Sequence, residues 1–235
     1  MLSFNFVGKN SYTDYGIVIS KRPTLHSPKI RVTYINIPGK NSSARYDEKT
    51  YDDITILVEC GLRKDVDLIE RLDQIKGWLF NAGEENLIFS FKEDKKYIAQ
   101  VVNNIDFTQA YKYISSFPIV FNCRPFKYSN ENQLTTFLES GRVINNIGTL
   151  ESEPTITVYG TGNITLNIND QSILLYDISP KIIINSEIKD CYDDEINNLN
   201  PKMSGEFPIF NTGENIISWL GNVEKIEVLP NWRWL

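Results

Sequence analysis

Short runs of alternating apolar and polar residues recur along the whole chain, with turn residues between them. Such alternation predicts β-strands that bury one face, and Gly, Pro and Asn between the runs predict the turns. In the first half the first two runs should form an opening hairpin, and Arg124-Pro125 should end the series. The strands expected there span residues 2–7, 15–19, 30–37, 51–60, 86–91, 97–102, 105–111 and 113–123.

One segment of the first half has a helical period instead. In residues 65–80, apolar side chains recur at steps of three and four, which predicts an amphipathic helix. Asp65 and Asp67 favour a helix start there, and Asn81-Ala82-Gly83 favours its end. Trp78 should fill a core or an interface. Residues 1–128 are therefore expected to form an α+β domain with an antiparallel sheet and one helix on one face.

The second half has an almost purely β pattern. Strands are expected at residues 134–139, 155–159, 164–168, 172–176, 182–184, 214–219 and 225–229. Gly160-Thr-Gly162, Asn169-Asp170 and Gly221-Asn222 read as the turns between neighbouring strands. About eight short strands without a helix predict a β-sandwich or jelly roll for residues 129–235. The fold class predicted for the whole chain is mainly β.

Residues Lys40–Thr50 (KNSSARYDEKT) interrupt the first pattern with a polar stretch of mixed charge. They are expected to form either a solvated connection or a projecting two-stranded arm. Long polar segments between strong strands are often functional, so the arm is a candidate contact between subunits. The candidate contact residues are Lys40, Asn41, Arg45, Tyr46, Asp47 and Glu48.

Composition narrows the classes of protein that remain. The 235 residues are 41% hydrophobic and 23% charged, which is ordinary for a folded soluble protein. The net charge of −6 disfavours nonspecific binding to nucleic acid. The first 16 residues lack the apolar core of a signal peptide, and no apolar run is long enough to span a membrane. We therefore expect neither secretion by a signal nor membrane insertion.

Residues that could carry chemistry are few. Cys60, Cys123 and Cys191 lie far apart without zinc-ligand spacing, so they are expected to be buried small residues or free thiols, and no metal or cofactor is expected. His26 is the single histidine, in a loop without a partner set, which indicates a solvated side chain. No GxSxG motif occurs. Catalysis by serine or cysteine is thus poorly supported.

Two further groups leave alternatives open. The acidic cluster Asp190, Asp193, Asp194 and Glu195 could serve a glycosidase or bind calcium, but a turn rich in Asx caps explains it better. Among the aromatic residues, Trp219 is expected in the core. Trp232 and Trp234 would anchor the C-terminus against the first domain, or would be exposed for stacking on a sugar.

Several stretches in the same order resemble the distal tail proteins (Dit) of siphophage-type tails. These are Phe4-Asn-Phe6-x-Gly8 with Asp14-Tyr15-Gly16-Ile17; Ile37-Pro38-Gly39; Ile75-Lys-Gly-Trp78-Leu79; Phe117-Pro118 with Cys123-Arg-Pro-Phe126-Lys-Tyr128; and Phe207-Pro208 with Thr212-Gly-Glu-Asn-x-Ile217-x-Trp219. The chain departs from the family at Lys40-Asn41-Ser42, where Arg-Asp/Asn-Gly is common. It also lacks the length for the carbohydrate-binding modules that some relatives insert.

The resemblance implies a non-enzymatic virion protein at the tail tip, assembled in the cytoplasm of a bacterial host. It implies a homohexameric ring between the tail-tube protein and the tail-associated hub protein, with a receptor-binding protein as a further neighbour. DNA would pass through the ring without being bound specifically. In the family the first domain forms the ring and a galectin-like domain lies outside it. The alternative function is a carbohydrate-binding protein that contacts cell-wall saccharide through exposed tryptophans.

Overall fold

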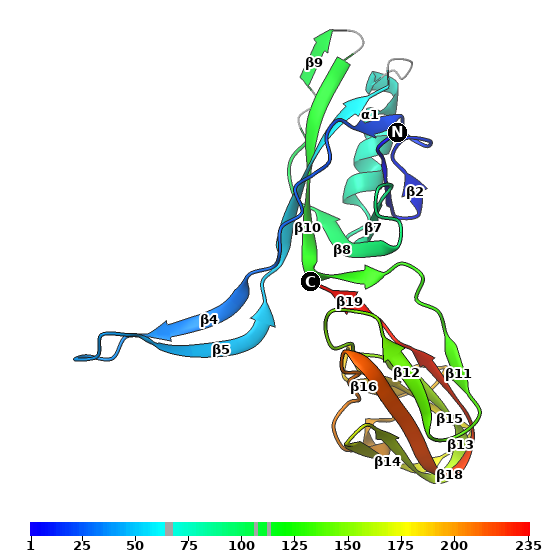
Figure 1. The fold of residues 1–235 in the computed structure, drawn as a ribbon. Helices are drawn as coiled ribbons and strands as arrows, with labels where there is room; N and C mark the ends of the chain where they lie inside the picture. Colours follow the sequence, from blue (N-terminus) through cyan, green and yellow to red (C-terminus); the bar gives the residue numbers. More distant parts are fainter. Residues whose placement is uncertain (64–67, 106–107, 112–113) are drawn as a thin grey trace. The chain divides into compact units, whose positions relative to one another are not determined.

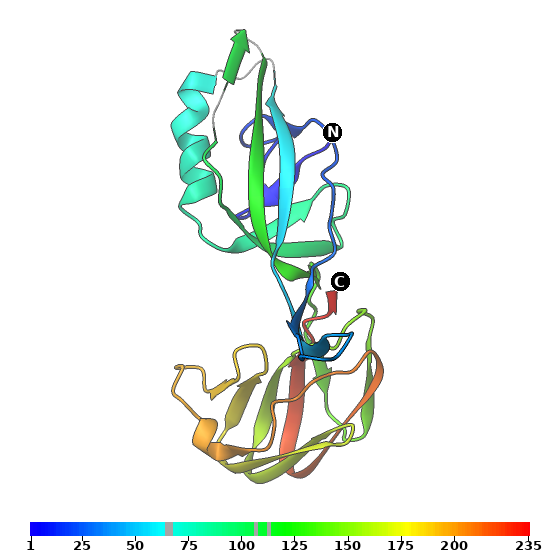
Figure 2. The same ribbon diagram turned by 90° about the vertical axis from the view of Figure 1, so that its left-hand side faces the viewer.

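The chain folds into two compact units, residues 1–130 with Leu235 and residues 131–234, each built mainly of antiparallel strands (Figures 1 and 2). This computed structural model describes residues 1–63, 68–105, 108–111 and 114–235. The predicted mainly β class is confirmed. No helix in these ranges is long and apolar enough to cross a membrane.

The first unit is built around one twisted antiparallel sheet in the order β2-β1-β7-β8-β10-β6-β3, with β9 paired to β10. A separate two-stranded ribbon consists of β4 and β5. The elements are β1 (Phe4–Phe6), β2 (Lys9–Asn10), β3 (Ile17–Ile19), β4 (Ile30–Ile35), β5 (Ala44–Tyr51), β6 (Ile54–Leu62), α1 (Leu68–Phe80), β7 (Glu85–Phe89), β8 (Lys95–Val101), β9 (Thr108–Tyr111) and β10 (Ile114–Ser129).

The core of this unit follows from the alternation in its strands. In β6 every second side chain from Ile54 to Cys60 is buried and the intervening ones are open to solvent. Helix α1 supplies Trp78 to the same core, where its ring stacks on Tyr15 at 4.3 Å between centroids. The indole N–H donates a hydrogen bond of 2.8 Å to the carbonyl of Phe6. Trp78 is therefore a core side chain with a satisfied polar group, one of its two predicted roles.

Two predictions for the first unit are wrong in detail. The opening hairpin does not pair the first two predicted strands, because β1 pairs with β2 and β7, whereas β3 pairs with β6. The strand β10 also continues past Arg124-Pro125, because a shift of register between Cys123 and Lys127 accommodates the proline, which has no N–H to donate. The predicted helix start at Asp65 and Asp67 lies outside the described residues.

The second unit is an antiparallel sheet that folds over on itself. Its central strands are the two longest, β13 and β18, which pair with each other along most of their length. The elements are β11 (Thr135–Phe137), β12 (Arg142–Asn146), β13 (Thr155–Ile168), β14 (Gln171–Ile178), β15 (Lys181–Asn185), β16 (Asp190–Tyr192), the 3-10 helix η1 (Asn200–Lys202), β17 (Met203–Ser204), β18 (Gly213–Leu229) and β19 (Arg233–Trp234).

Each long strand of this unit contributes to two groups of strands. Residues 155–159 of β13 pair with β15, and residues 162–168 pair with β14. Residues 213–217 of β18 pair with β12, and residues 226–228 pair with β11. The chain changes from one group to the other where the register between β13 and β18 shifts. Bent strands of this kind form the corners of a sandwich.

Glycine marks the corner in both long strands, where the sequence had predicted hairpin turns. A Cβ atom on Gly160 would lie 2.3 Å from the carbonyl oxygen of Asn222. Gly221 has φ of +113°, and a Cβ there would lie 2.6 Å from the carbonyl oxygen of Asn163. Both positions therefore need glycine because two backbones cross closely. The predicted hairpins at Gly160-Thr-Gly162 and Gly221-Asn222 are wrong, since each is a bend within one strand.

We expect Gly160→Ala to lower the free energy of unfolding by about 1–3 kcal/mol, because the added methyl group meets backbone that cannot move aside. Gly77→Ala is the matched control, because a Cβ there meets nothing closer than 3.8 Å in helix α1. The control should stabilise the protein by about 0.5–1 kcal/mol. Urea unfolding measures both, and equal effects of the two substitutions would show that the corner is not tightly packed.

Candidate subunit-contact arm

The ribbon β4–β5 extends from the first unit as an arm (Figure 1). Its register pairs Thr33 with Tyr46 and Tyr34 with Arg45, and residues 36–43 connect the two strands. The predicted arm is therefore present, while the alternative of a solvated connection is wrong for residues 44–50 because they are a strand. At about 3.3 Å per residue, eight extended residues give the arm a length of about 25 Å.

Contacts across the ribbon keep its strands in register. The guanidinium of Arg45 lies 5.7 Å from the centre of the Tyr34 ring, which is a cation–π contact on one face. On the other face the hydroxyl of Thr33 donates a hydrogen bond of 2.9 Å to a carboxylate oxygen of Glu48. Cross-strand pairs of this kind each contribute roughly 0.2–1 kcal/mol. These contacts specify how β4 pairs with β5, but they do not give the ribbon a hydrophobic core.

A bulge shapes the strand β5 near its end. Val32 lies opposite Asp47 and Ile30 lies opposite Tyr51, so β5 has two more residues than β4 over this interval. Lys49 takes a positive φ of 53° there, and its N–H donates a 2.8 Å hydrogen bond to the Asp47 carboxylate. Bulges increase the local twist of a ribbon and interrupt regular pairing. The bulge therefore orients the outer part of the arm.

The base of the arm is fixed by an ion pair and an aromatic contact. Arg31 donates to the Asp52 carboxylate at 2.6 Å, and this hydrogen bond raises the pKa of Arg31. The Tyr51 ring meets the edge of Phe126 in β10 at 5.4 Å between centroids. Exposed ion pairs are weak, so the aromatic contact is the firmer attachment.

The arm leaves much apolar surface open to solvent. Tyr46, Tyr34 and Ile35 are 64%, 61% and 55% exposed, and Ile30 and Ile37 are exposed as well. A two-stranded ribbon is at best marginally stable by itself in water. Exposed apolar side chains gathered in this way are typical of interaction surfaces, which makes the arm a candidate contact site.

All six predicted contact residues lie on this arm and are exposed. Lys40 and Asn41 lie in the connection, and the other four lie on β5. The structure adds Tyr34 and Ile35 of β4 to the exposed surface of the arm. The sequence had predicted that these two residues belong to an ordinary half-buried strand. The alternation in residues 30–37 could not reveal that this strand lacks a core to cover.

The acidic cluster is a capped turn, as the simpler interpretation predicted. The Asp193 carboxylate accepts backbone hydrogen bonds of 3.0 Å from both Glu195 and Asn197. Its pKa is lowered, chiefly by the hydrogen bond from the Asn197 side chain. Asp194 pairs with Lys181 at 2.7 Å. Among the residues that the structure describes, no group of three or more His, Cys, Asp or Glu side chains could hold a metal ion.

His26 lines an open groove of about 560 Å³ between residues 21–29 and the strand β6. It is exposed, as expected for a solvated loop histidine. Lys21, Arg22 and Lys29 line the same groove. Asp53 and Glu59 face these cations, so the groove has mixed charge.

The tryptophans of the second unit do not offer a platform for a sugar. Trp219 and Trp232 are both buried, and the Trp232 ring lies 5.8 Å from Phe210 in the core of its own unit. Trp234 is partly buried against the same core. Trp232 therefore packs within the core of its own unit.

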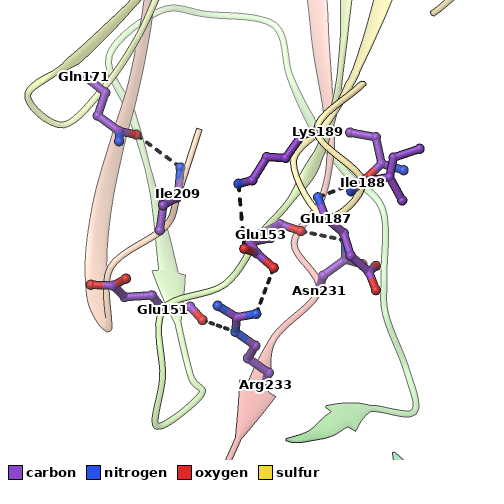
Figure 3. Close-up of polar contacts among 10 residues, drawn as sticks. Glu151, Glu153, Gln171, Glu187, Ile188, Lys189, Ile209, Asn231 and Arg233 are labelled. Atoms are coloured by element: carbon purple, nitrogen blue, oxygen red, sulfur yellow. Dashed lines mark hydrogen bonds and ion pairs between the residues drawn. The ribbon is translucent and has the colours of Figure 1, made fainter. Parts of the chain in front are cut away.

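Polar contacts fix the C-terminal segment beside this core (Figure 3). Arg233 donates to the Glu153 carboxylate at 2.9 Å and also to the carbonyl of Glu151. The Asn231 side chain donates to the Glu153 carbonyl at 2.9 Å, and Lys189 lies 3.7 Å from the other carboxylate oxygen. Glu153 thus connects its own segment to the C-terminal segment, through Asn231 and Arg233, and to Lys189.

The three cysteines are free thiols and are buried in the cores. Both alternatives that the sequence left open, buried small residues and free thiols, therefore apply. Cys60 and Cys123 lie in the first core and Cys191 in the second. Burial raises the pKa of each thiol to about 12. A thiol that stays protonated and out of contact with water is chemically inert.

Residues 10–123 match the family described as the phage tail protein RIFT-related domain. The crystal structure of SPP1 Dit, described as a hub adsorption apparatus in phages that infect Gram-positive bacteria, superimposes with a TM-score of 0.80. That match covers 100% of both chains at 14% sequence identity. No curated protein matches the chain.

Over its whole length, the chain has the fold of a Dit-like siphophage tail protein, as the resemblance in its sequence indicated.

We expect alkaline pH to destabilise the protein through its buried thiols. Exposed thiols of the unfolded chain ionise near pH 8.5, whereas the folded thiols have a pKa of about 12. The unfolded state loses protons first, so stability is full below about pH 8.5 and falls as the pH rises toward 12. Urea midpoints at pH 8, 9.5 and 10.5 test this. A Cys60→Ala, Cys123→Ala, Cys191→Ala triple variant should show a shallower fall, and identical slopes would contradict the assignment.

Proposed function

We propose that the protein is a distal tail component whose copies form a hexameric ring at the tail tip. The observation that carries this proposal is the similarity of fold to SPP1 Dit over 100% of both chains. A match of both units, in the same order, is more specific than a match of either β-rich unit alone. On this proposal residues 1–128 form the ring and residues 129–235 form a galectin-like domain outside it.

The arm supports a ring built from identical copies. A cyclic ring needs head-to-tail contacts, in which one surface of a copy meets a different surface of the next. An arm with exposed aromatic and aliphatic side chains provides one such surface. The six residues Lys40, Asn41, Arg45, Tyr46, Asp47 and Glu48 are proposed to contact the neighbouring copy.

The charge of the chain supports passage of DNA without binding. The net charge of −6 disfavours adhesion of a polyanion to the protein as a whole. The ring would join the tail-tube protein on one side to the tail-associated hub protein on the other, with a receptor-binding protein as a further neighbour. Assembly would take place in the cytoplasm of the bacterial host before the virion is released.

Deleting Asn41–Lys49 should abolish the hexamer while leaving each unit folded, because the deleted residues contribute no side chain to either core. Sedimentation velocity of the intact chain should show a hexamer, and negative-stain images should show six-fold rings with a central hole. The deletion variant should sediment as smaller species and still unfold cooperatively, with a far-ultraviolet circular dichroism spectrum typical of β-sheet. A stable hexamer of the variant would refute the role of the arm.

A further inference from the structure

A small apolar pocket in the first unit has the size for one side chain of a partner. Its volume is about 230 Å³, below the range of about 300–1,000 Å³ typical of pockets for small ligands. The lining residues come from the loop at 21–29, the strands β7, β8 and β10, and the turn between β7 and β8. They are Leu25, Phe89, Phe91, Lys92, Lys95, Tyr97 and Lys127, and we call this the lysine-rimmed pocket.

Aromatic rings give the lysine-rimmed pocket a firm apolar wall. Phe89 stacks on Phe91 with centroids 5.1 Å apart, and it meets Tyr97 edge-on at 6.2 Å. Phe89 and Tyr97 are buried in the core of the unit, so their positions are fixed. Leu25 is 41% exposed beside them. A rigid wall with an exposed aliphatic edge can receive a ring from another chain.

The rim of this pocket is positively charged. Lys92 and Lys95 share one carboxylate, that of Asp94, at 3.2 and 3.5 Å. The pKa of Lys127 is lowered, first by burial and then by repulsion from Lys95 and Lys92. Burial likewise lowers the pKa of Lys95. A carboxylate brought to this rim would relieve that repulsion.

One part of the arm has the complementary chemistry. Tyr46 is 64% exposed, and Glu48, two residues further along β5, lies on the same face of the ribbon. The other exposed tyrosine of the arm, Tyr34, carries the guanidinium of Arg45 over its ring. That face would bring a cation toward the lysines. The face with Tyr46 and Glu48 brings an anion.

We infer that the lysine-rimmed pocket receives the arm of a second copy of this chain, with the Tyr46 ring in the apolar pocket and Glu48 beside Lys95 and Lys127. The inference rests on the proposed ring and names the surface that accepts the arm. The donor and acceptor surfaces differ, so the contact is heterologous and is of the kind that closes a ring. The groove at His26 is a poorer acceptor, because Asp53 and Glu59 face its cations.

Substitutions in the full-length chain test the aromatic part of the contact. Tyr46→Ala should weaken assembly at least about tenfold, because aromatic anchors in a pocket are typical hot spots of an interface. Tyr176→Ala, at an exposed tyrosine of β14 in the second unit, is the matched control and should change assembly less than about threefold. Sedimentation velocity over a concentration series measures both. Equal losses for the two variants would overturn the assignment of the docking face.

A charge exchange tests the ionic part. Glu48→Lys and Lys127→Glu should each weaken assembly about two- to tenfold, and the double variant should assemble within about twofold of the unaltered protein. Lys96→Glu is the control, since residue 96 lies on the opposite face of β8 from Lys95. A double variant that assembles no better than the single variants would overturn the ionic contact.

Chemical crosslinking separates this inference from the proposed ring. Carbodiimide treatment of mixed nitrogen-15-labelled and unlabelled protein should give isotopically mixed Glu48–Lys127 or Glu48–Lys95 peptides in mass spectra. Hexameric rings that crosslink Glu48 only to other lysines would overturn the docking site and leave the ring intact. A chain that remains monomeric at every concentration would contradict both.

Discussion

A ribbon of two strands has no interior, and this constraint governs how the arm can function. Pairing between β4 and β5 satisfies backbone groups, but both faces stay in water, together with Tyr34, Ile35 and Tyr46. The Arg45–Tyr34 and Thr33–Glu48 contacts fix the register of the two strands. They do not remove the free-energy cost of leaving apolar side chains exposed to water. On the proposed function, a contact with a second copy would supply this missing free energy.

The sequence located most strands of this fold because alternation records which side chains face a core. It was less informative about which strands pair, since pairing depends on residues far apart in the chain. The second strand that the sequence predicted illustrates this, because Ile17–Ile19 (β3) pairs with β6 and not with β1. Gly160 and Gly221 show the same limit, since a glycine in a turn and a glycine at a strand crossing look alike in sequence. The close approach that distinguishes them exists only in the folded unit.

The candidate arm was predictable in part for the same reason. Polarity and mixed charge marked residues 40–50 as exposed, and the six predicted residues are exposed. Its partner strand carried an apolar alternation, which ordinarily means a buried face, so the contribution of Tyr34 and Ile35 was missed. The lysine-rimmed pocket was also beyond sequence reasoning, because Lys92, Lys95 and Lys127 are gathered by the pairing of β8 with β10.

The buried thiols have a consequence for the chemical durability of the protein. Neither unit relies on a disulfide among its three cysteines, and each of these sulfurs is shut away from water. The covalent structure of the chain is therefore the same in a reducing cell interior as in oxygenated surroundings. The folded protein can therefore pass from one of these environments to the other without forming or losing a disulfide bond.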